Sequence, residues 1–240
     1  MIIKNKTYRY SNISSNLISF EVCSEETDLW IRANEDLTDI AMDLVLTCRK
    51  QIRDQIQKNP SFLTSFIPVA PVFPIAPIVH EMSIAANIAQ TGPMAAVAGA
   101  VATYVGKGLE AFSQNVIVEN GGDLYITSQT PITIGVYAGE SVLSNKIGIT
   151  IPACQGIGVC TSSGTVGHSY SRGKADAVCV VANNPIVADA IATQLGNYVQ
   201  TPKDFSHVME MGKKNSHVQG ILLIIKDQMA VWGDIQLVSI

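Results

Sequence analysis

Residues 160–169 are the stretch of this sequence whose side chains are best suited to chemistry. They read Cys-Thr-Ser-Ser-Gly-Thr-Val-Gly-His-Ser, with five hydroxyl groups, two glycines, a thiol and an imidazole. Buried hydroxyls need hydrogen-bond partners and glycines weaken regular elements, so this composition argues against a core strand or helix. It predicts a loop that places its backbone against a polar ligand. An ordinary polar turn explains the composition equally well.

A second candidate is the run Asn120-Gly-Gly-Asp123, which lies between two apolar, strand-like segments. The glycines Gly121 and Gly122 permit positive φ and leave backbone N–H groups uncovered, so these groups could face a ligand oxygen. Asp123 could accept a hydrogen bond from a ligand hydroxyl or lie near a cation. The alternative is a hairpin or bulge in which the aspartate only forms the turn.

The third candidate is the pair Asp189 and Thr193, which stand four residues apart in a segment with helical character. Residues at this spacing share one face of a helix, so a carboxylate and a hydroxyl there could bind a hard cation such as Mg²⁺. The alternative is an aspartate favoured by the helix dipole and a threonine bonded to a backbone carbonyl.

Composition restricts the class of partner. The 240 residues are 47% hydrophobic and 15% charged, with a net charge of −4, which gives no attraction to nucleic acid or to an anionic membrane. The five scattered cysteines form no Cys-x-x-Cys pair, and the first ten residues lack the apolar run of a secretory signal. We therefore expect reduced thiols, no zinc site and a cytoplasmic location.

The elements that must position these residues follow from periodicity. An apolar stripe predicts a helix over residues 37–56, begun by Asn34 or Asp36, and the nearly uncharged stretch 62–105 is divided by prolines three residues apart. That spacing is typical of an extended segment and excludes a membrane-spanning helix, so we expect a buried, proline-rich crossover at 66–79. The other predicted helices cover residues 81–90, 93–112 and 186–198. The predicted strands lie within the first thirty-odd residues and at 116–119, 124–126, 132–137, 147–151, 177–181, 221–226, 229–232 and 235–240. Without a regular alternation of strand and helix, an α+β fold is favoured over a doubly wound sheet.

Four blocks of the sequence resemble those of the ApbE superfamily of Mg²⁺-dependent flavin transferases. They read Gly99-Ala-Val-Ala102, Asn120-Gly-Gly-Asp123, Thr161-Ser-Ser-Gly164 and Ala188-Asp-Ala-Ile-Ala-Thr193. A closer resemblance is to the UPF0280 family, a cytosolic branch of that superfamily. It extends over most of residues 8–199 and includes the run Cys160-Thr-Ser-Ser-Gly-Thr-Val-Gly-His168.

The resemblance implies one ApbE-like domain over residues 1–240, with mostly antiparallel strands and packed helices, in one body or two closely packed lobes. It implies Mg²⁺ and FAD or FMN as cofactors, and a small phosphorylated molecule as the ligand. The metal ligands would be Asp189, Thr193 and a backbone carbonyl near Gly99 or Ala100. The residues expected to contact the cofactor are Asn120, Gly121, Gly122, Asp123, Ser162, Ser163, Gly164 and Thr165.

Two functions remain open at this point. In the first, the chain is an enzyme of the flavin- or nucleotidyl-transferase type, with His168 as general acid or base. In the second, it is a non-catalytic accessory protein, which the resemblance links to sulfur and homocysteine metabolism, with Cys160 as a functional thiol. A buried structural cysteine is the alternative for Cys160. The small-residue helix and the strand-rich C-terminal part are compatible with a homodimer.

Overall fold

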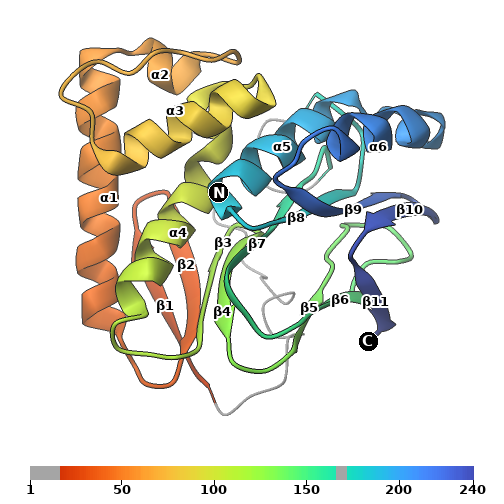
Figure 1. Cartoon of the computed structure of the whole chain (residues 1–240), viewed down its shortest axis with the longest axis horizontal. Coiled ribbons are helices and arrows are strands. Elements are labelled where there is room, and N and C mark those ends of the chain that lie inside the picture. Colours follow the sequence, from red (N-terminus) through yellow and green to blue (C-terminus); the bar gives the residue numbers. More distant parts are fainter. Residues whose placement is uncertain (1–16, 166–171) are drawn as a thin grey trace.

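The computed structural model describes residues 17–165 and 172–240. In these residues the chain forms a layer of helices, an eight-stranded sheet and a three-stranded sheet (Figure 1). The strands are β1 (Ile18–Ser24), β2 (Thr27–Ala33), β3 (Val116–Asn120), β4 (Asp123–Ser128), β5 (Ile132–Gly135), β6 (Ile147–Ile151), β7 (Cys154–Ser162), β8 (Ala177–Ala182), β9 (Val218–Ile225), β10 (Gln228–Gly233) and β11 (Gln236–Ser239). The helices are α1 (Thr38–Lys58), α2 (Ser61–Thr64), α3 (Pro77–Ala89), α4 (Val97–Leu109), α5 (Pro185–Tyr198) and α6 (Phe205–Lys213), with short 3-10 turns η2 (Pro93–Ala96) and η3 (Pro202–Asp204).

The large sheet has the order β1-β2-β3-β4-β7-β8-β9-β10, and the small sheet has the order β11-β6-β5. Every pair of neighbouring strands in both sheets is antiparallel. The predicted α+β class with mostly antiparallel strands is therefore confirmed.

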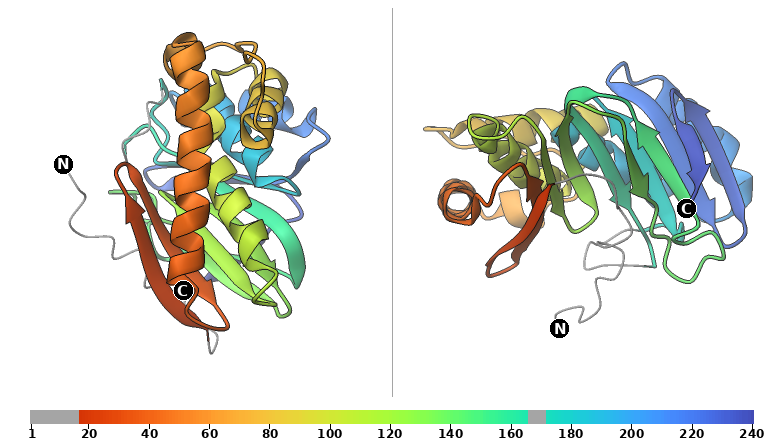
Figure 2. Two further views of the ribbon diagram at one scale, coloured as in Figure 1. Left: turned by 90° about the vertical axis from the view of Figure 1, so that its left-hand side faces the viewer. Right: turned by 90° about the horizontal axis from the view of Figure 1, so that it is seen from below.

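Two hydrophobic clusters hold the layers together. The larger cluster joins the helices to one face of the large sheet, and it includes Val45 of α1, Val105 of α4 and Ile191 of α5. The second joins the opposite face of that sheet to the small sheet, and it includes Ile126 of β4 and Ile149 of β6. Figure 2 shows the helices gathered on one side of the curved large sheet. Alternating strand side chains thus serve two different cores, one on each face.

Helix α1 follows its apolar stripe closely. Its buried residues Ala41, Val45 and Ile52 recur at the spacing of one helix face. Of the two residues predicted to begin the helix, Asp36 accepts a hydrogen bond at Oδ1 from the Thr38 backbone N–H at 3.0 Å, whereas Asn34 Oδ1 accepts from the Asn115 N–H. Figure 2 shows α1 running along the side of the molecule.

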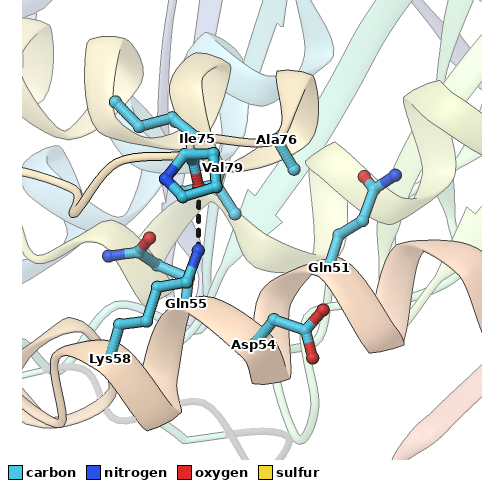
Figure 3. Close-up of a pocket in the computed structure, with 8 residues that line it drawn as sticks. Gln51, Asp54, Gln55, Lys58, Ile75, Ala76 and Val79 are labelled. Atoms are coloured by element: carbon cyan, nitrogen blue, oxygen red, sulfur yellow. Dashed lines mark hydrogen bonds between the residues drawn. The ribbon is translucent and has the colours of Figure 1, made fainter.

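The proline-rich crossover differs from the prediction. It is extended, but no residue of 66–77 is buried, and Phe73 is 84% exposed. The segment lies over the side of α1, where Lys58 Nζ donates to the Pro74 carbonyl at 2.9 Å (Figure 3). In the amide orientation that satisfies both groups, Gln55 also pairs with the backbone N–H and carbonyl of Val72. Apolar composition alone suggested burial, whereas these polar contacts hold the segment at the surface.

The prediction of a loop from residue 160 onward is also corrected. Residues 160–162 belong to β7, where Cys160 pairs with Val180 and Ser162 with Val178 of β8. Cys160 and Ser162 are both buried there. Pairing with β8 and the hydrogen bond from the Thr161 N–H to Asp123 satisfy backbone groups here, so a short polar run can end a core strand.

Two further predictions concern the whole chain. All five cysteines carry free thiols, in agreement with the expectation of no disulfide framework. Within residues 17–165 and 172–240, no single helix has the length and apolar character needed to cross a membrane. Helices α3 and η2–α4 meet those criteria only when taken together, and they are bent by 105° at their junction.

Candidate functional site

The first turn of α4 is bonded to α5 through Asp189. The Asp189 Oδ2 atom accepts a hydrogen bond from the Gly99 backbone N–H at 2.8 Å. Helix α4 has no side-chain cap from its own N-terminal residues, so the carboxylate supplied by α5 meets the partial positive charge at the start of α4. A side chain at position 99 would have its Cβ 2.6 Å from the Pro185 carbonyl oxygen, so glycine is required for this close approach. The Gly99 carbonyl accepts from Thr103 Oγ1 at 2.7 Å.

The turn between β3 and β4 lies beside the same helix end. Asn120 Nδ2 donates to the carbonyl of Ala98 at 3.2 Å, which ties the turn to α4. Gly121 and Gly122 both have positive φ, at 66° and 106°. The N–H of Gly122 is taken by Glu119 Oε1 at 2.8 Å, whereas a Cβ at Gly121 would meet nothing within 4 Å. The open space of this turn is therefore at Gly121.

A buried group of three side chains lies where these segments meet the end of β7. Asp123 Oδ1 accepts from the Thr161 backbone N–H at 3.2 Å, and Cys160 Sγ donates to the Pro185 carbonyl at 3.4 Å. The Cys160 thiol also interacts with the carboxyl groups of Asp123 and Asp189, and these two carboxyl groups interact with each other. We call Asp123, Cys160 and Asp189 the carboxyl–thiol cluster. Residues from β4, β7 and α5, far apart in sequence, thus share one location.

Burial sets the protonation of this cluster. The pKa of Asp123 is raised to about 7, chiefly by desolvation and to a smaller extent by the nearby Glu119 carboxylate, while the Thr161 N–H and the Cys160 thiol act in the opposite direction. Desolvation raises the pKa of Asp189 well above its ordinary value, and the charge of Asp123 adds to this effect. Both carboxyl groups therefore favour the protonated form more than an exposed carboxyl group does.

The same burial acts on the thiol. Desolvation raises the pKa of Cys160 well above its ordinary value, and both neighbouring carboxylates increase the shift. Cys160 is 0% exposed, so it stays a protonated thiol out of reach of solvent at neutral pH. This environment matches the buried structural alternative for Cys160 rather than a redox thiol.

Residues 163–165, the rest of the predicted loop that the structure describes, bond mainly to a neighbouring segment. The Gly164 N–H donates to the Ala175 carbonyl at 2.9 Å, and Thr165 Oγ1 donates to Asp176 Oδ1 at 3.0 Å. Ser163 Oγ accepts from the Thr165 N–H at 3.1 Å. These hydrogen bonds fix the shape of residues 163–165, and their predicted contact with a cofactor stays a prediction.

Three predicted residues need separate mention. Thr193 lies one turn after Asp189 on α5 and is half-buried, and Ala100 is fully buried inside the first turns of α4. His168 falls in 166–171, outside the described residues. In the part of the chain that the structure describes, no three or more His, Cys, Asp or Glu side chains are grouped as metal ligands. The predicted Mg²⁺ set is of another kind, because it combines a carboxylate, a hydroxyl and a carbonyl.

A separate cavity of about 270 Å³ lies between α1 and the start of α3 (Figure 3). It is lined by Gln51, Asp54, Gln55, Lys58, Pro74, Ile75, Ala76 and Val79. None of the predicted site residues lines it. Two of its lining residues, Gln55 and Lys58, bond to the crossover segment. We therefore attribute the cavity to the way this segment packs against α1.

Two contributors to the cluster were not predicted from the sequence. Glu119 is 4% exposed and lies close enough to Asp123 to influence its charge. Pro185, the first residue of α5, contacts both Gly99 and Gly158, since a Cβ at either glycine would lie within 2.6 Å of it. The signal for Glu119 was present in β3, where it is the one charged residue in an otherwise apolar strand.

Comparisons with known proteins agree with this architecture. The family model described as AbpE bacteria matches residues 11–227. The UPF0280 protein of Methanococcus aeolicus is 38% identical over 227 residues, covering 91% of both chains. The UPF0280 protein of Methanocaldococcus jannaschii is 39% identical over 201 residues, covering 81% of this chain and 82% of that protein.

Solved structures show the same fold at low identity. Flavin transferase ApbE from Vibrio cholerae superposes with a TM-score of 0.59 at 13% identity, covering 90% of this chain and 96% of the other. The ApbE protein of Thermotoga maritima gives a TM-score of 0.55 at 16% identity, covering 89% of this chain and 96% of the other. The sequence matches and the shared architecture together show that this chain belongs to the UPF0280 family of the ApbE-like superfamily.

Proposed function

We propose that this chain binds a flavin nucleotide together with Mg²⁺ where α4, α5, the β3–β4 turn and the end of β7 meet. The observation that carries the proposal is the carboxyl–thiol cluster, in which Asp123 and Asp189 are each only 8% exposed and lie close to one another. Two buried carboxyl groups are costly unless a proton or a cation neutralises them. The shared fold with a protein named flavin transferase supports a flavin as the ligand.

The donor atoms fit Mg²⁺ better than a softer metal. Mg²⁺ is usually held by one or two carboxylates, keeps several waters and contacts substrate phosphates. Asp189 would supply the main carboxylate, Thr193 a hydroxyl oxygen and the backbone near Gly99 or Ala100 a carbonyl. Because Asp189 also accepts the Gly99 N–H at 2.8 Å, its carboxylate orientation is fixed.

The chain's own residues would bind and orient the ligand. The open space at Gly121 leaves room for a ligand beside the β3–β4 turn, and Asp123 offers a hydrogen-bond donor while it is protonated. When bound, Mg²⁺ would neutralise charge on a phosphate group of the nucleotide. We propose further that the chain catalyses a transfer reaction, with His168 as general acid or base.

The test is a thermal-unfolding titration with FAD and FMN, each with and without Mg²⁺. A ligand at about 100 times its Kd adds about 2.7 kcal/mol of stability, which corresponds to roughly 5–10 °C for a chain of this size. We expect this increase only with flavin and Mg²⁺ together. Asp189→Asn should abolish it, because the amide keeps the hydrogen bond to Gly99 but loses the charge.

The matched control is Glu110→Gln at the other end of α4, where the carboxylate bonds to Tyr125 and Thr127. This variant should keep the ligand-dependent increase in Tm. If no flavin nucleotide raises the Tm of the parent protein in the presence of Mg²⁺, the proposal is wrong. A non-catalytic accessory role would then be the better interpretation.

A further inference from the structure

In the loop that follows β7, the hydrogen-bond donors of the exposed residues Gly164 and Thr165 are already used by the protein. The Gly164 N–H donates to the Ala175 carbonyl at 2.9 Å, and the Thr165 N–H donates to Ser163 Oγ at 3.1 Å. The Thr165 hydroxyl donates to Asp176 Oδ1 at 3.0 Å. Within the part of the chain that the structure describes, these two residues therefore offer a ligand acceptor atoms only.

Asp176, which directly precedes β8, determines the direction of the Thr165 hydroxyl. It is only 9% exposed, and its Oδ2 atom accepts a hydrogen bond from the Lys226 N–H at 2.6 Å. Its own N–H donates to the Ile224 carbonyl at 2.9 Å, so the sheet fixes the residue on one side. Because an ionised carboxylate only accepts hydrogen bonds, the Thr165 hydroxyl hydrogen must point toward Asp176. The lone pairs of the hydroxyl are left for another donor.

Close backbone packing holds Gly164 in this position. A Cβ at Gly164 would lie 2.1 Å from the Gly173 carbonyl oxygen, and a Cβ at Gly173 would lie 1.9 Å from the Gly196 carbonyl oxygen of α5. The Lys174 N–H donates to the Val199 carbonyl at 2.7 Å, just beyond the end of α5. The Gly164 N–H cannot turn toward a ligand without breaking these contacts.

This arrangement is unsuited to a phosphate group, although the loop begins beside the carboxyl–thiol cluster. The Thr161 N–H donates to Asp123, and a Cβ at Gly122 would lie 3.9 Å from the Thr161 carbonyl oxygen. Phosphate-binding loops present free backbone N–H groups. A phosphate at Thr165 would meet none from residues 164 and 165, and the nearby Asp176 carboxylate would repel it.

We propose that Gly164 and Thr165 receive a hydrogen-bond-donating group of the ligand, a hydroxyl or an N–H, and that Asp176 is the positioning residue that makes Thr165 an acceptor. The inference rests on the proposed binding of a flavin nucleotide, whose sugar chain carries hydroxyl groups and whose ring carries an N–H. The phosphate groups of the same ligand then belong on the side of Asp189. Asp176 thus determines which part of the ligand enters the loop.

The first test is the Kd of FMN with Mg²⁺, measured by isothermal titration calorimetry for the parent, Thr165→Val and Thr165→Ser. Valine keeps the volume but removes the acceptor, so the Kd should rise roughly fivefold, whereas serine keeps the hydroxyl and should restore the parent Kd to within about twofold. Thr165 is exposed, so both variants should keep the Tm of the ligand-free parent.

A Thr165→Val variant with the parent Kd overturns the inference and leaves the proposed function intact. If FMN with Mg²⁺ does not bind to the parent protein at all, the proposed function and the inference are both wrong. The two failures are therefore distinguishable in one set of titrations.

The second test is Asp176→Asn, which reverses the hydrogen bond to Thr165. The Lys226 N–H can only donate, so the amide oxygen must face it and the amide NH₂ must face Thr165. Thr165 then accepts from the amide, and its own hydroxyl hydrogen turns outward. The matched control is Asp227→Asn, which removes the same charge from an exposed residue next to Lys226.

The change in the Kd of FMN identifies the group in the loop. A ligand N–H would face a new donor, so the Kd should rise roughly fivefold above that of Asp227→Asn, whereas a ligand hydroxyl can reverse its own bond and should give the Kd of the control. Either result, together with the loss in Thr165→Val, supports the proposal. A Kd below that of the control would show that the loop receives an acceptor such as phosphate, and would overturn it.

Discussion

At the scale of single residues, the carboxyl–thiol cluster costs the folded protein stability, because its carboxyl groups are buried. Asp123, Asp189 and Glu119 bring three acidic groups into a region where each is less than 10% exposed. Perturbed carboxyl groups of this kind are typical of functional sites, because a stable fold alone gains nothing from them. The neighbouring Cys160 thiol is uncharged and interacts with both Asp123 and Asp189.

Asp123→Asn should stabilise the metal-free protein at pH 8. The pKa of Asp123 is raised to about 7 from an ordinary value of 3.8, so the folded state loses stability as pH rises from about 4 to about 7 and stays lower above that. The gain from the substitution should therefore reach several kcal/mol at pH 8 and shrink as pH falls through 7. Urea unfolding at pH 5 and pH 8 measures it.

The groups that face Asp123 are Glu119, Asp189 and Cys160. Glu119 raises the pKa of Asp123 and the hydrogen bond from the Cys160 thiol lowers it, whereas Asp123 in turn raises the pKa of Asp189. Glu119→Gln is the matched comparison, since it removes only one contributor to the shift and should give a smaller gain. A gain from Asp123→Asn that is equal at both pH values would contradict the assigned protonation.

At the scale of elements, the site depends on how closely α4 and α5 approach. Gly99 lets the first turn of α4 contact Pro185 and Asp189, and Asn184 begins α5 by accepting hydrogen bonds from the N–H groups of Ile186 and Val187. The start of one helix therefore supplies a carboxylate to the start of another. Neither helix end would form a site by itself.

Gly99→Ala should destabilise the fold by about 1–3 kcal/mol, because its Cβ would lie 2.6 Å from the Pro185 carbonyl oxygen and 2.9 Å from Asp189 Cβ. It should also weaken any Mg²⁺-dependent increase in Tm. Gly108→Ala on the same helix is the control. Its Cβ would meet only the Leu44 side chain, which can rotate, so a change within about 1 kcal/mol is expected. Equal losses for both variants would show that helix contact at Gly99 is unimportant.

At the scale of the whole molecule, the two hydrophobic clusters lie on opposite faces of the large sheet. Cys160 belongs to the cluster on the helical face, whereas Ile149 belongs to the cluster between the two sheets. The small sheet therefore supports the fold from the face opposite the candidate site.

Ile149→Ala should lower the free energy of unfolding by about 2–5 kcal/mol, since Ile149 is fully buried between the sheets. At a temperature where the variant remains folded, its affinity for a flavin nucleotide with Mg²⁺ should match that of the parent. Chemical denaturation and isothermal titration calorimetry measure the two quantities. A loss of affinity in the folded variant would show that flavin binding also depends on the hydrophobic cluster between the two sheets.

Local patterns determined much of this protein. The apolar stripe predicted α1 within two residues at each end, the run at 186–198 predicted α5, and the C-terminal hairpin appears as β9 and β10. The sequence blocks around Asp123, Cys160 and Asp189 were predicted to belong to one site, and in the structure these three residues lie in one place. Helix α6 was missed, since its nine residues carry only a short periodic pattern.

Other features were decided by tertiary structure. Apolar composition suggested a buried crossover at 66–79, yet its position at the surface depends on contacts with α1. Hydroxyl-rich composition suggested a loop at residue 160, yet pairing with β8 makes residues 160–162 part of a core strand. Burial and charge state come from residues far apart in the chain, so the raised pKa values of Asp123 and Asp189 exist only once β4, β7 and α5 have come together.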